Sequence, residues 1–407
     1  MRRYGLLGEH LGHSFSPQIH KMIGGYDYDL FERSPEELEE FLRSGPFDAI
    51  NVTIPYKKAV IPYCAELSPQ ARDIGSVNTI VRRPDGSLYG DNTDYYGFLY
   101  TIRHSGVDVT GKTCLLFGDG GVAPTIRTVL RDLHAGKVIT VSRKGEVNFS
   151  MLDAYYDAQI LINATPVGMY PNNGTAVTSL EPFTRLEAAF DLVYNPHKTE
   201  FLRQAEGKGA VAVNGLRMLV AQAKRGSEIF QGVELDDSII EPIREKMAKN
   251  SMNIALIGMA GCGKSTTGAA LAAALGRKFI DCDNLIPEYA GKSIQDIFAQ
   301  DGEDAFRKVE TAVLRDVSKQ SSLVIATGGG VVTRPENLPL LRQNSVTLLL
   351  HRPVEDLPTD GRPMSQKHGA AALYEKRKPL YEAWGEYRFA CNGVESTVAA
   401  IREALGV

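Results

Sequence analysis

The sequence predicts an α/β protein with more than one domain. Two short apolar stretches, residues 114–118 and 254–257, each lead directly into a glycine-rich turn and then into a helix-like stretch. This order is typical of parallel sheets that are covered by helices. At 407 residues, the chain is also too long for one typical hydrophobic core. We therefore expect several α/β domains built around mainly parallel sheets.

The first 250 residues are predicted to hold two domains. Residues 137–141 form a second apolar strand after the strand and helix that begin at residue 114, which completes a βαβ unit. Earlier strands at 49–52 and 79–82 alternate with a helix at 35–43. The expected domains are an α/β domain at residues 1–105 and a domain built on this βαβ unit at residues 106–213.

A further boundary is predicted near residue 250. A polar, helix-like stretch at 238–250 changes abruptly at Met252 into the apolar strand at 254–257. An internal methionine directly before a first strand suits the start of a formerly separate protein. We expect a linker at residues 246–251 and a third domain at residues 252–407.

The composition is that of an ordinary globular protein, with 43% hydrophobic and 23% charged residues. A net charge of -4 and a pI near 6.1 give no reason to expect nucleic acid or an anionic membrane as partner. No apolar run is long enough to span a bilayer, and the first residues lack the apolar core of a signal peptide. The five cysteines form no CxxC pair, which is typical of free thiols in a reducing compartment. We expect a cytoplasmic protein; its oligomeric state, including a homo-oligomer, stays open.

Residues 258–265, Gly-Met-Ala-Gly-Cys-Gly-Lys-Ser, match the phosphate-binding pattern G-x-x-x-x-G-K-[ST] in full. In this P-loop, converging backbone N–H groups hold phosphate oxygens, and the helix that follows points its positive end at them. Lys264 is expected to reach the β- and γ-phosphates of ATP, and Ser265 to bind Mg²⁺. The predicted nucleotide-binding residues are Gly258, Gly261, Cys262, Gly263, Lys264, Ser265 and Thr266.

Two carboxylates follow in the next predicted strand. Asp281 and Asp283 lie two residues apart, so in a strand both side chains would project to one side. One could hold Mg²⁺ through water while the other accepts a hydrogen bond from an acceptor hydroxyl. Residues 328–330 form a second glycine turn at the end of another strand. Candidate ligands for a carboxylate or for the transferred phosphoryl group are Arg307, Arg362 and Arg377.

With these features, residues 252–407 resemble shikimate kinase, which implies a P-loop domain like that of nucleoside monophosphate kinases, together with ATP and Mg²⁺. The matching motifs are the P-loop and residues 279–283, 297–310, 328–330, 362–364 and 377–381. The resemblance implies that Asp283 binds the ring hydroxyls of shikimate and orients the nucleophile. It also implies that Arg307, Gly329 and Arg377 complete the shikimate site. Ser265 and Asp281 are the predicted Mg²⁺ ligands.

A mobile lid is the one part of the kinase pattern that departs from the family. The resemblance implies that Arg362 comes from this lid and stabilises the transferring phosphoryl group. The segment between Arg352 and Arg362 is shorter than the usual lid and lacks an additional arginine. Because lids exclude water and complete the charge clamp, we expect an effect on turnover and on ATP affinity.

The earlier glycine turn, at residues 118–123 (Gly-Asp-Gly-Gly-Val-Ala), follows a strand and opens a helix, which is the setting of a Rossmann dinucleotide site. Gly118, Gly120 and Gly121 are the predicted cofactor-binding residues of this turn. The next strand ends in Ser142, Arg143 and Lys144, with no acid for a ribose 2′-hydroxyl. One charge-assisted hydrogen bond to a 2′-phosphate corresponds to about 10–150-fold in affinity. The sequence therefore favours NADP(H).

Two ionisable residues before this unit are catalytic candidates. Lys57 follows a strand and a proline turn, and Asp94 lies in a polar turn before a helix. An ammonium near a carbonyl oxygen can donate a proton as hydride arrives, and a carboxylate can orient it. The sequence alone does not place the two side chains together.

Residues 1 to about 245 resemble shikimate dehydrogenase. The resemblance implies a substrate domain at residues 1–105, completed by helices that return at 214–245, and a Rossmann NADP-binding domain at residues 106–213. The matching motifs are residues 13–17 (His-Ser-Phe-Ser-Pro), 51–57, 76–79, 90–94, 163–169 (Asn-Ala-Thr-Pro-Val-Gly-Met), 191–194 and 214–222. The resemblance implies that Lys57 and Asp94 form a catalytic dyad and that Asn163 and Thr165 lie near the nicotinamide. The implied substrate-binding residues are Ser14 and Ser16 for the carboxylate and Asn78, Asp94 and Gln222 for the ring hydroxyls. Thr53 is also a predicted substrate-binding residue.

Two residues of the glycine turn depart from this family. Asp119 stands where a small neutral residue is usual, and Pro124 stands where a basic residue is common. Pro124 is compatible with a first helical turn. Asp119 places a negative charge near a pyrophosphate, so Asp119→Ala is expected to lower KM for NADPH. Cys262 in the P-loop has two interpretations: a small residue that fits the loop, or an oxidisable thiol at a helix N-terminus.

The two resemblances together predict a bifunctional enzyme. It would reduce 3-dehydroshikimate with NADPH and then phosphorylate shikimate from ATP. One alternative is a dehydrogenase half that uses quinate, which differs by one ring hydroxyl. A second alternative is a regulator that binds the metabolites without catalysis, but the chain keeps Lys57, Asp94, Lys264 and Asp283 and contains no DNA-binding module.

Overall fold

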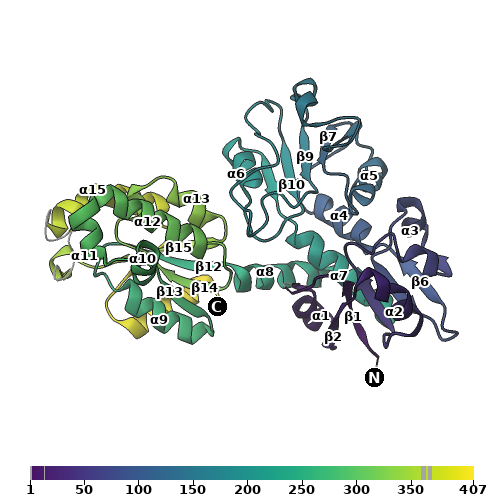
Figure 1. Cartoon of the computed structure of the whole chain (residues 1–407), viewed down its shortest axis with the longest axis horizontal. Helices are drawn as coiled ribbons and strands as arrows, with labels where there is room; N and C mark the ends of the chain where they lie inside the picture. The colour runs from purple at the N-terminus through teal and green to yellow at the C-terminus, as the bar shows by residue number, and fades with distance from the viewer. Residues whose placement is uncertain (1, 13, 359–363, 365–368) are drawn as a thin grey trace. The chain divides into compact units, whose positions relative to one another are not determined.

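The computed structural model of the chain describes residues 2–12, 14–358, 364 and 369–407. The chain divides into two compact units, which can be followed by colour from purple to yellow in Figure 1. The first unit contains Met1–Tyr194 and Thr199–Met247, and the second contains Asn195–Lys198 and Ala248–Val407. Both units are α/β, so the predicted fold class is confirmed.

The first unit begins with a mixed six-stranded sheet in the order β2-β1-β3-β5-β6-β4. Its strands are β1 (Tyr4–Gly8), β2 (Tyr28–Glu32), β3 (Ala49–Val52), β4 (Glu66–Leu67), β5 (Thr79–Arg82) and β6 (Leu88–Asp91). The helices of this part of the chain are α1 (Ser16–Gly24), α2 (Leu38–Ser44), α3 (Pro69–Ile74), α4 (Thr93–Arg103) and α7 (Leu216–Gln231). The boundary between the two units falls within the next helix, α8 (Ile240–Ser251). Helix α7 packs against α1, α4 and the strands β3 and β5. The chain therefore returns to this sheet after residue 213.

A second sheet of the same unit is parallel throughout, in the order β11-β10-β9-β7-β8. Its elements are β7 (Thr113–Phe117), α5 (Ala123–Asp132), β8 (Lys137–Val141), β9 (Ile160–Asn163), β10 (Ala188–Asp191), α6 (Glu200–Gly207) and β11 (Val211–Val213). Apolar clusters cover both faces, as a parallel sheet requires. The chain passes from β8 to β9 across β7, and ligands of such sheets bind beyond the carboxyl ends of the strands at this crossover.

The second unit has a third parallel sheet, in the order β13-β14-β12-β15-β16. Its strands are β12 (Asn253–Ile257), β13 (Lys278–Asp281), β14 (Leu323–Ala326), β15 (Ser345–His351) and β16 (Tyr387–Ala390). Its helices are α9 (Lys264–Leu275), α10 (Cys282–Ala290), α11 (Ile294–Asp296), α12 (Gly302–Val317), α13 (Asn337–Arg342), α15 (Ala370–Trp384) and α16 (Val394–Leu405). All of β12 is buried at the centre of the sheet, and the P-loop follows directly from it.

Asp283 does not lie in a strand, so that sequence expectation is wrong. Strand β13 ends at Asp281, whose Oδ1 accepts a hydrogen bond from the backbone N of Asp283 at 3.1 Å and caps α10. The helix therefore begins at Cys282, and the two carboxylates do not share the face of a strand. Residues 246–251, expected as a linker, form the last part of α8.

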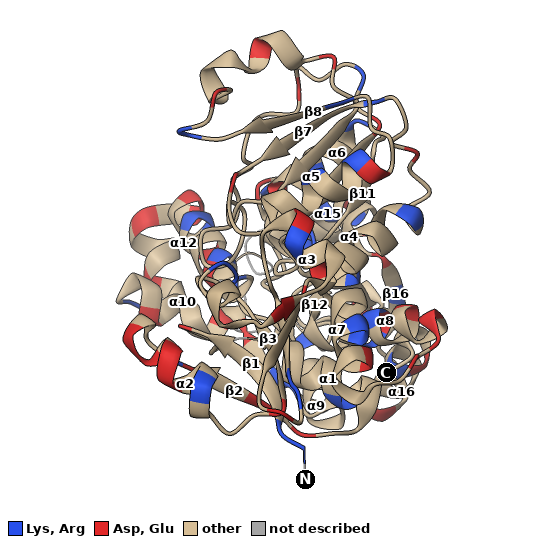
Figure 2. Cartoon of the chain, turned by 90° about the vertical axis from the view of Figure 1, so that its right-hand side faces the viewer, with Lys and Arg blue, Asp and Glu red and all other residues tan. Residues whose placement is uncertain are grey.

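Charged residues of both signs are interspersed along the chain. Helices α2 and α12 each carry acidic and basic residues, as the colours of Figure 2 show. Within the described ranges, the structure contains no helix that combines the length and the apolar character needed to cross a membrane.

Candidate active sites

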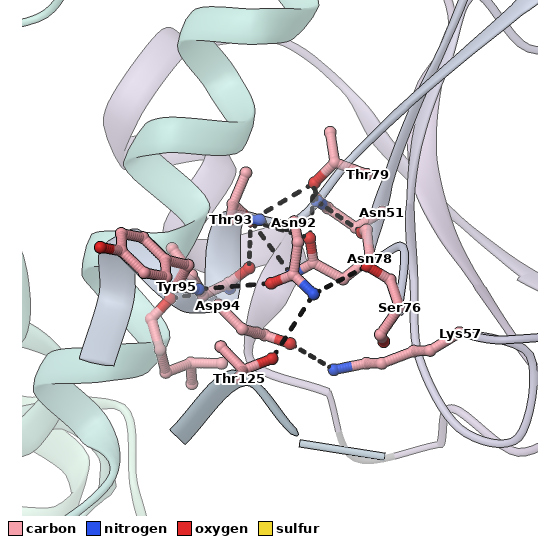
Figure 3. A network of polar contacts seen from close by, with 12 residues as sticks. Asn51, Lys57, Ser76, Asn78, Thr79, Asn92, Thr93, Asp94, Tyr95 and Thr125 are labelled. Atoms are coloured by element: carbon pink, nitrogen blue, oxygen red, sulfur yellow. Dashed lines mark hydrogen bonds and ion pairs between the residues drawn. The ribbon is translucent and has the colours of Figure 1, made fainter. Parts of the chain in front are cut away.

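Lys57 and Asp94, which the sequence leaves unpaired, meet in the first unit (Figure 3). Lys57 lies in the turn after β3. Asp94 lies in the first turn of α4 rather than before it, because the side chain of Asn92 caps that helix. Lys57 Nζ and Asp94 Oδ2 are 2.6 Å apart, and the two side chains are 15% and 10% exposed. In so shielded a place the attraction between the charges is stronger than in water, so the ammonium is held in one position.

A buried network of amides and hydroxyls lies beside this pair (Figure 3). Asn78 accepts a hydrogen bond from the backbone N of Thr93 at 2.7 Å and donates one to Thr93 Oγ1 at 3.1 Å. Thr93 Oγ1 lies 3.4 Å from Oε1 of Gln222, which belongs to α7. Thr79 Oγ1 accepts a hydrogen bond from Asn51 Nδ2 at 3.0 Å. The structure thus brings the predicted ring-binding residues Asn78, Asp94 and Gln222 together.

The two predicted carboxylate-binding serines lie at the start of α1. The backbone N of Ser16 donates to Ser14 Oγ at 3.2 Å, so the serines are joined to each other. Phe15, between them, packs on the ring of Tyr194, with the ring centroids 5.3 Å apart. Thr53 follows β3, and its backbone N donates to the carbonyl of Leu7 at 2.9 Å. Among the described residues, neither serine forms a hydrogen bond to Lys57 or Asp94.

The turn after β7 fits a dinucleotide pyrophosphate. Gly118 has a φ of 100°, and a Cβ there would lie 2.8 Å from Thr165 Cγ2, so this position requires glycine. A Cβ at Gly120 or Gly121 would meet nothing within 4 Å, so the backbone there is open to a ligand. Helix α5 begins directly after the turn and directs its N-terminal N–H groups toward it.

The side chain of Asn163 is buried, and its hydrogen bonds are made within the protein. Its Nδ2 donates to Asp191 Oδ1 at 3.0 Å and to the carbonyl of Val167 at 3.2 Å. Its Oδ1 accepts hydrogen bonds from the N and Oγ1 of Thr165, at 3.0 and 2.6 Å. Asn163 is fully buried, so it shapes the turn at 163–169, and Thr165 is the residue that lies against the glycine turn.

Asp191, at the end of β10, anchors this arrangement. Burial raises the pKa of Asp191 to about 7, although Thr199 Oγ1, the backbone N of Val193 and Asn163 all donate hydrogen bonds to it. A carboxyl whose folded pKa is raised stabilises the fold at low pH, and this contribution is lost as the pH rises through the folded value.

Asp191→Asn is therefore expected to change the pH dependence of stability. Asparagine does not ionise, and its amide can donate to Thr199 Oγ1. The Tm of the variant minus that of the wild type should increase between about pH 5 and about pH 8, measured by calorimetry of the full chain. The relevant transition is that of the first unit, which contains Asp191. An equal difference in Tm at both pH values would contradict a raised pKa of Asp191 in the folded state.

Asp119 is not an isolated negative charge. Its Oδ1 lies 2.7 Å from Nη1 of Arg127 in α5, and the same Nη1 donates to Thr140 Oγ1 in β8 at 3.3 Å. The negative charge that the sequence places near the pyrophosphate is therefore paired with a guanidinium, and the expected effect of Asp119 on KM for NADPH stays a prediction. Near the end of β8, Ser142 is half-buried, whereas Arg143 and Lys144 are exposed.

The P-loop of the second unit is formed and its lysine is held in place. Lys264 Nζ donates to the carbonyls of Gly258 and Met259, both at 2.9 Å, and the residue is buried. Gly258 has a φ of 142°, and a Cβ there would lie 2.3 Å from the carbonyl oxygen of Leu350. This conformation and this close approach both require glycine.

Ser265 and Asp281, the predicted Mg²⁺ ligands, lie in contact. Ser265 Oγ donates to Asp281 Oδ2 at 2.5 Å. Mg²⁺ usually takes one or two protein oxygens and completes its shell with phosphates and water, so this pair fits it. In the part of the chain that the structure describes, no group of three or more His, Cys, Asp or Glu side chains is suited to a metal ion.

Cys262 is 1% exposed within the P-loop. Reactive thiols are usually partly exposed, so the structure favours the interpretation of Cys262 as a small residue that fits the loop. The predicted nucleotide-binding residues Gly261, Gly263 and Thr266 occupy the turn and the first turn of α9 beside it.

The second unit contains a buried charge cluster, formed by Asp283 of α10 and by Arg307 and Glu310 of α12. Arg307 Nη1 and Glu310 Oε2 lie 2.7 Å apart, with the side chains 6% and 1% exposed. Burial raises the pKa of both Asp283 and Glu310. Among the described residues, Asp283 Oδ1 and Glu310 Oε1 find no hydrogen-bond partner. Buried polar atoms without a partner are rare in folded proteins, which marks this cluster as a functional candidate.

The glycine turn after β14 closes against this cluster. A Cβ at Gly328 would lie 2.9 Å from Asp283 Oδ1 and 2.2 Å from Glu310 Oε1. Arg377 Nη1 donates to the carbonyl of Gly329 at 3.0 Å, and the hydroxyl of Tyr381 donates to the same oxygen. The structure therefore brings Asp283, Arg307, Gly329 and Arg377 together from α10, α12, the glycine turn and α15.

One predicted residue stays unplaced, and three residues were not predicted. Arg362 lies outside the described residues. Glu310 was missed, although it stands three residues after Arg307 on one helix, the spacing of side chains that can pair. Asp191 lies in the motif at 191–194 and Arg127 lies eight residues after Asp119, but no pattern in the sequence pairs either side chain with its partner.

Comparisons with known proteins find separate relatives for the earlier and the later part of the chain. The family model of the shikimate dehydrogenase substrate binding domain matches residues 6–80, and that of shikimate kinase matches residues 260–404. A shikimate dehydrogenase (NADP(+)) of Clostridium perfringens is 37% identical over 268 residues, 61% of this chain and 98% of the relative. One of Caldicellulosiruptor bescii is 33% identical over 279 residues, 61% of this chain and 96% of that protein.

Solved structures resemble the same part of the chain. A chorismate mutase/shikimate 5-dehydrogenase fusion protein from Clostridium acetobutylicum has a TM-score of 0.58 and 37% identity, covering 61% of this chain and 97% of its own. Shikimate 5-dehydrogenase from Thermus thermophilus, in complex with NADP(H) and shikimate, has a TM-score of 0.53 and 30% identity, covering 60% and 99%. The chain therefore belongs to the shikimate dehydrogenase family, and a shikimate kinase domain follows the dehydrogenase in the same chain.

Proposed function

We propose that this oxidoreductase and kinase takes two successive steps of the shikimate pathway in the cytoplasm. It reduces 3-dehydroshikimate to shikimate with NADPH, and it then transfers a phosphoryl group from ATP to give shikimate 3-phosphate. The proposal is carried by one observation: the shielded Lys57–Asp94 pair and a P-loop beside the buried Asp283 occur in one chain.

In the reduction, bound NADPH supplies the hydride. Lys57 donates a proton to the carbonyl oxygen of the substrate as negative charge develops there. Asp94 keeps the ammonium in position at 2.6 Å. Asn78 and Gln222 offer amide donors and acceptors to the ring hydroxyls, and the hydroxyls of Ser14 and Ser16 bind the carboxylate.

In the phosphorylation, ATP with Mg²⁺ supplies the phosphoryl group. Asp283 accepts a hydrogen bond from the acceptor hydroxyl and orients its oxygen for in-line attack. Its raised pKa makes it a better proton acceptor than an exposed aspartate. Arg307 and Arg377 bind the carboxylate of shikimate, and Lys264 exchanges the carbonyls of Gly258 and Met259 for phosphate oxygens.

One assay tests both steps. The protein is mixed with 3-dehydroshikimate, NADPH and ATP, and NADPH loss and ADP formation are followed together. We expect NADPH to fall first and ADP to appear only when NADPH is present. ADP formation at the same rate without NADPH, or no loss of NADPH, would refute the proposed sequence. Quinate with NADP⁺ is the control for a quinate-using dehydrogenase, and binding of the metabolites without turnover would indicate a regulator.

A further inference from the structure

We propose that Asp119 favours the binding of NADP(H), because it holds Arg127 where the guanidinium can bind the 2′-phosphate of the cofactor. This inference rests on the proposed use of NADP(H) by the dehydrogenase. The expected effect of Asp119 on cofactor affinity is then the opposite of the one that the sequence suggests, since a carboxylate in the glycine turn would by itself repel the cofactor.

Arg127 connects the two segments that border the adenosine ribose in a Rossmann site. Its Nη1 contacts Asp119 Oδ1 at 2.7 Å, in the turn after β7, and Thr140 Oγ1 at 3.3 Å, in β8. Strands β7 and β8 are neighbours, and Leu116 pairs with Thr140 near their carboxyl ends. A guanidinium bonded to both segments therefore lies between the glycine turn and the end of β8.

Thr140 places the guanidinium close to the residues predicted to bind the 2′-phosphate. Thr140 lies in the last part of β8, and Ser142 directly follows the strand, so Thr140 holds Arg127 close in the chain to Ser142. Val141, between them, is buried in the apolar cluster of the opposite face. Arg127 thus adds a cation from α5 to the group formed by Ser142, Arg143 and Lys144.

The guanidinium can still bind an anion. Both of its contacts use Nη1, and the described part of the chain provides no other partner, so Nη2 and Nε remain available as donors. The side chain of Arg127 is 39% exposed, so a phosphate can reach it. Because an exposed ion pair adds little to stability, the main effect of Asp119 is on where it holds the guanidinium.

Binding of NADP⁺, 2′,5′-ADP and NAD⁺ to the full chain, measured by titration calorimetry, tests this assignment. The decisive variant is the double substitution Asp119→Asn with Arg127→Leu, because it leaves no unpaired charge. We expect it to bind NADP⁺ and 2′,5′-ADP about tenfold more weakly, the loss of one hydrogen bond to a charged group. NAD⁺ binding, which reports an intact turn, should not change. Asp119→Asn alone should also weaken NADP⁺ binding.

A second ion pair on the same helix is the matched control. Arg131 of α5 lies 2.7 Å from Asp73 of α3 and 2.9 Å from Asp132 on the surface, and Asp73→Asn with Arg131→Leu should leave the binding of all three ligands unchanged. Wild-type affinity in the Asp119 and Arg127 double variant, or tighter NADP⁺ binding by Asp119→Asn, would overturn the inference. If the wild type itself bound NADP⁺ no better than NAD⁺, the proposed cofactor would be wrong instead.

Discussion

Lys57→Ala is expected to lower kcat for the reduction of 3-dehydroshikimate by about 10²–10⁴-fold, the usual contribution of a positioned proton donor. The physical reason is the 2.6 Å contact with Asp94 in a place where both side chains are largely shielded from water. A water molecule that took the place of this ammonium would be a much weaker proton donor. In the coupled assay, ADP formation from 3-dehydroshikimate should stop, whereas ADP formation from added shikimate should continue.

Two controls separate chemistry from folding in this test. Lys58, the next residue, is exposed, and Lys58→Ala should leave both activities unchanged. Asp94→Asn combined with Lys57→Ala should be little worse than Lys57→Ala alone, because residues that act as one unit are not additive. A Lys57→Ala variant that kept its kcat, or that also lost shikimate phosphorylation, would refute the assigned role.

Lys264→Ala is expected to lower the kcat of shikimate phosphorylation by about 10²–10³-fold, the loss seen when one preorganised donor to a developing charge is removed. NADPH oxidation should be unaffected. The lysine is buried and already held by two carbonyls of the P-loop, so its ammonium is in place before the nucleotide arrives. Alanine would leave those carbonyls without this donor, so the Tm of the kinase transition should also fall.

Lys278 provides the matched control for this variant, because it is exposed on β13 of the same unit. Lys278→Ala should retain both activities. The Lys264→Ala measurements are kcat with shikimate and ATP, the rate of NADPH loss with 3-dehydroshikimate, and calorimetry of the full chain. Loss of NADPH oxidation in this variant would show that the two sites are not independent.

The sequence predicts short strands well. The predicted strands at 49–52, 79–82 and 137–141 agree with β3, β5 and β8. Each is a short run of mainly apolar residues bounded by polar or glycine positions, so local pattern and tertiary burial favour the same structure. Glycine turns at Gly118 and Gly258 were also predictable, because no other residue tolerates their backbone conformation and close contacts.

Helix starts and side-chain partners were harder to predict. Asp283 follows an apolar run, so the local pattern predicts a strand there, but the cap made by Asp281 begins a helix one residue earlier. The pair Asp119–Arg127 joins the glycine turn to the helix that follows it, and Asn163–Asp191 joins the ends of two parallel strands. A sequence specifies that geometry only through the whole fold, so a local pattern does not reveal the partners.

The buried charge cluster of Asp283, Arg307 and Glu310 has a consequence for attempts to make this enzyme resist heat. Replacing buried ionic groups by well-packed apolar residues is often neutral or stabilising by about 1–4 kcal/mol. A screen that selects survivors of heating without assaying turnover would therefore accept variants that have lost this cluster, and with it shikimate phosphorylation. Substitutions meant to raise thermal stability belong on the solvent-facing sides of helices such as α2 and α16. Each round of selection should also assay kinase turnover.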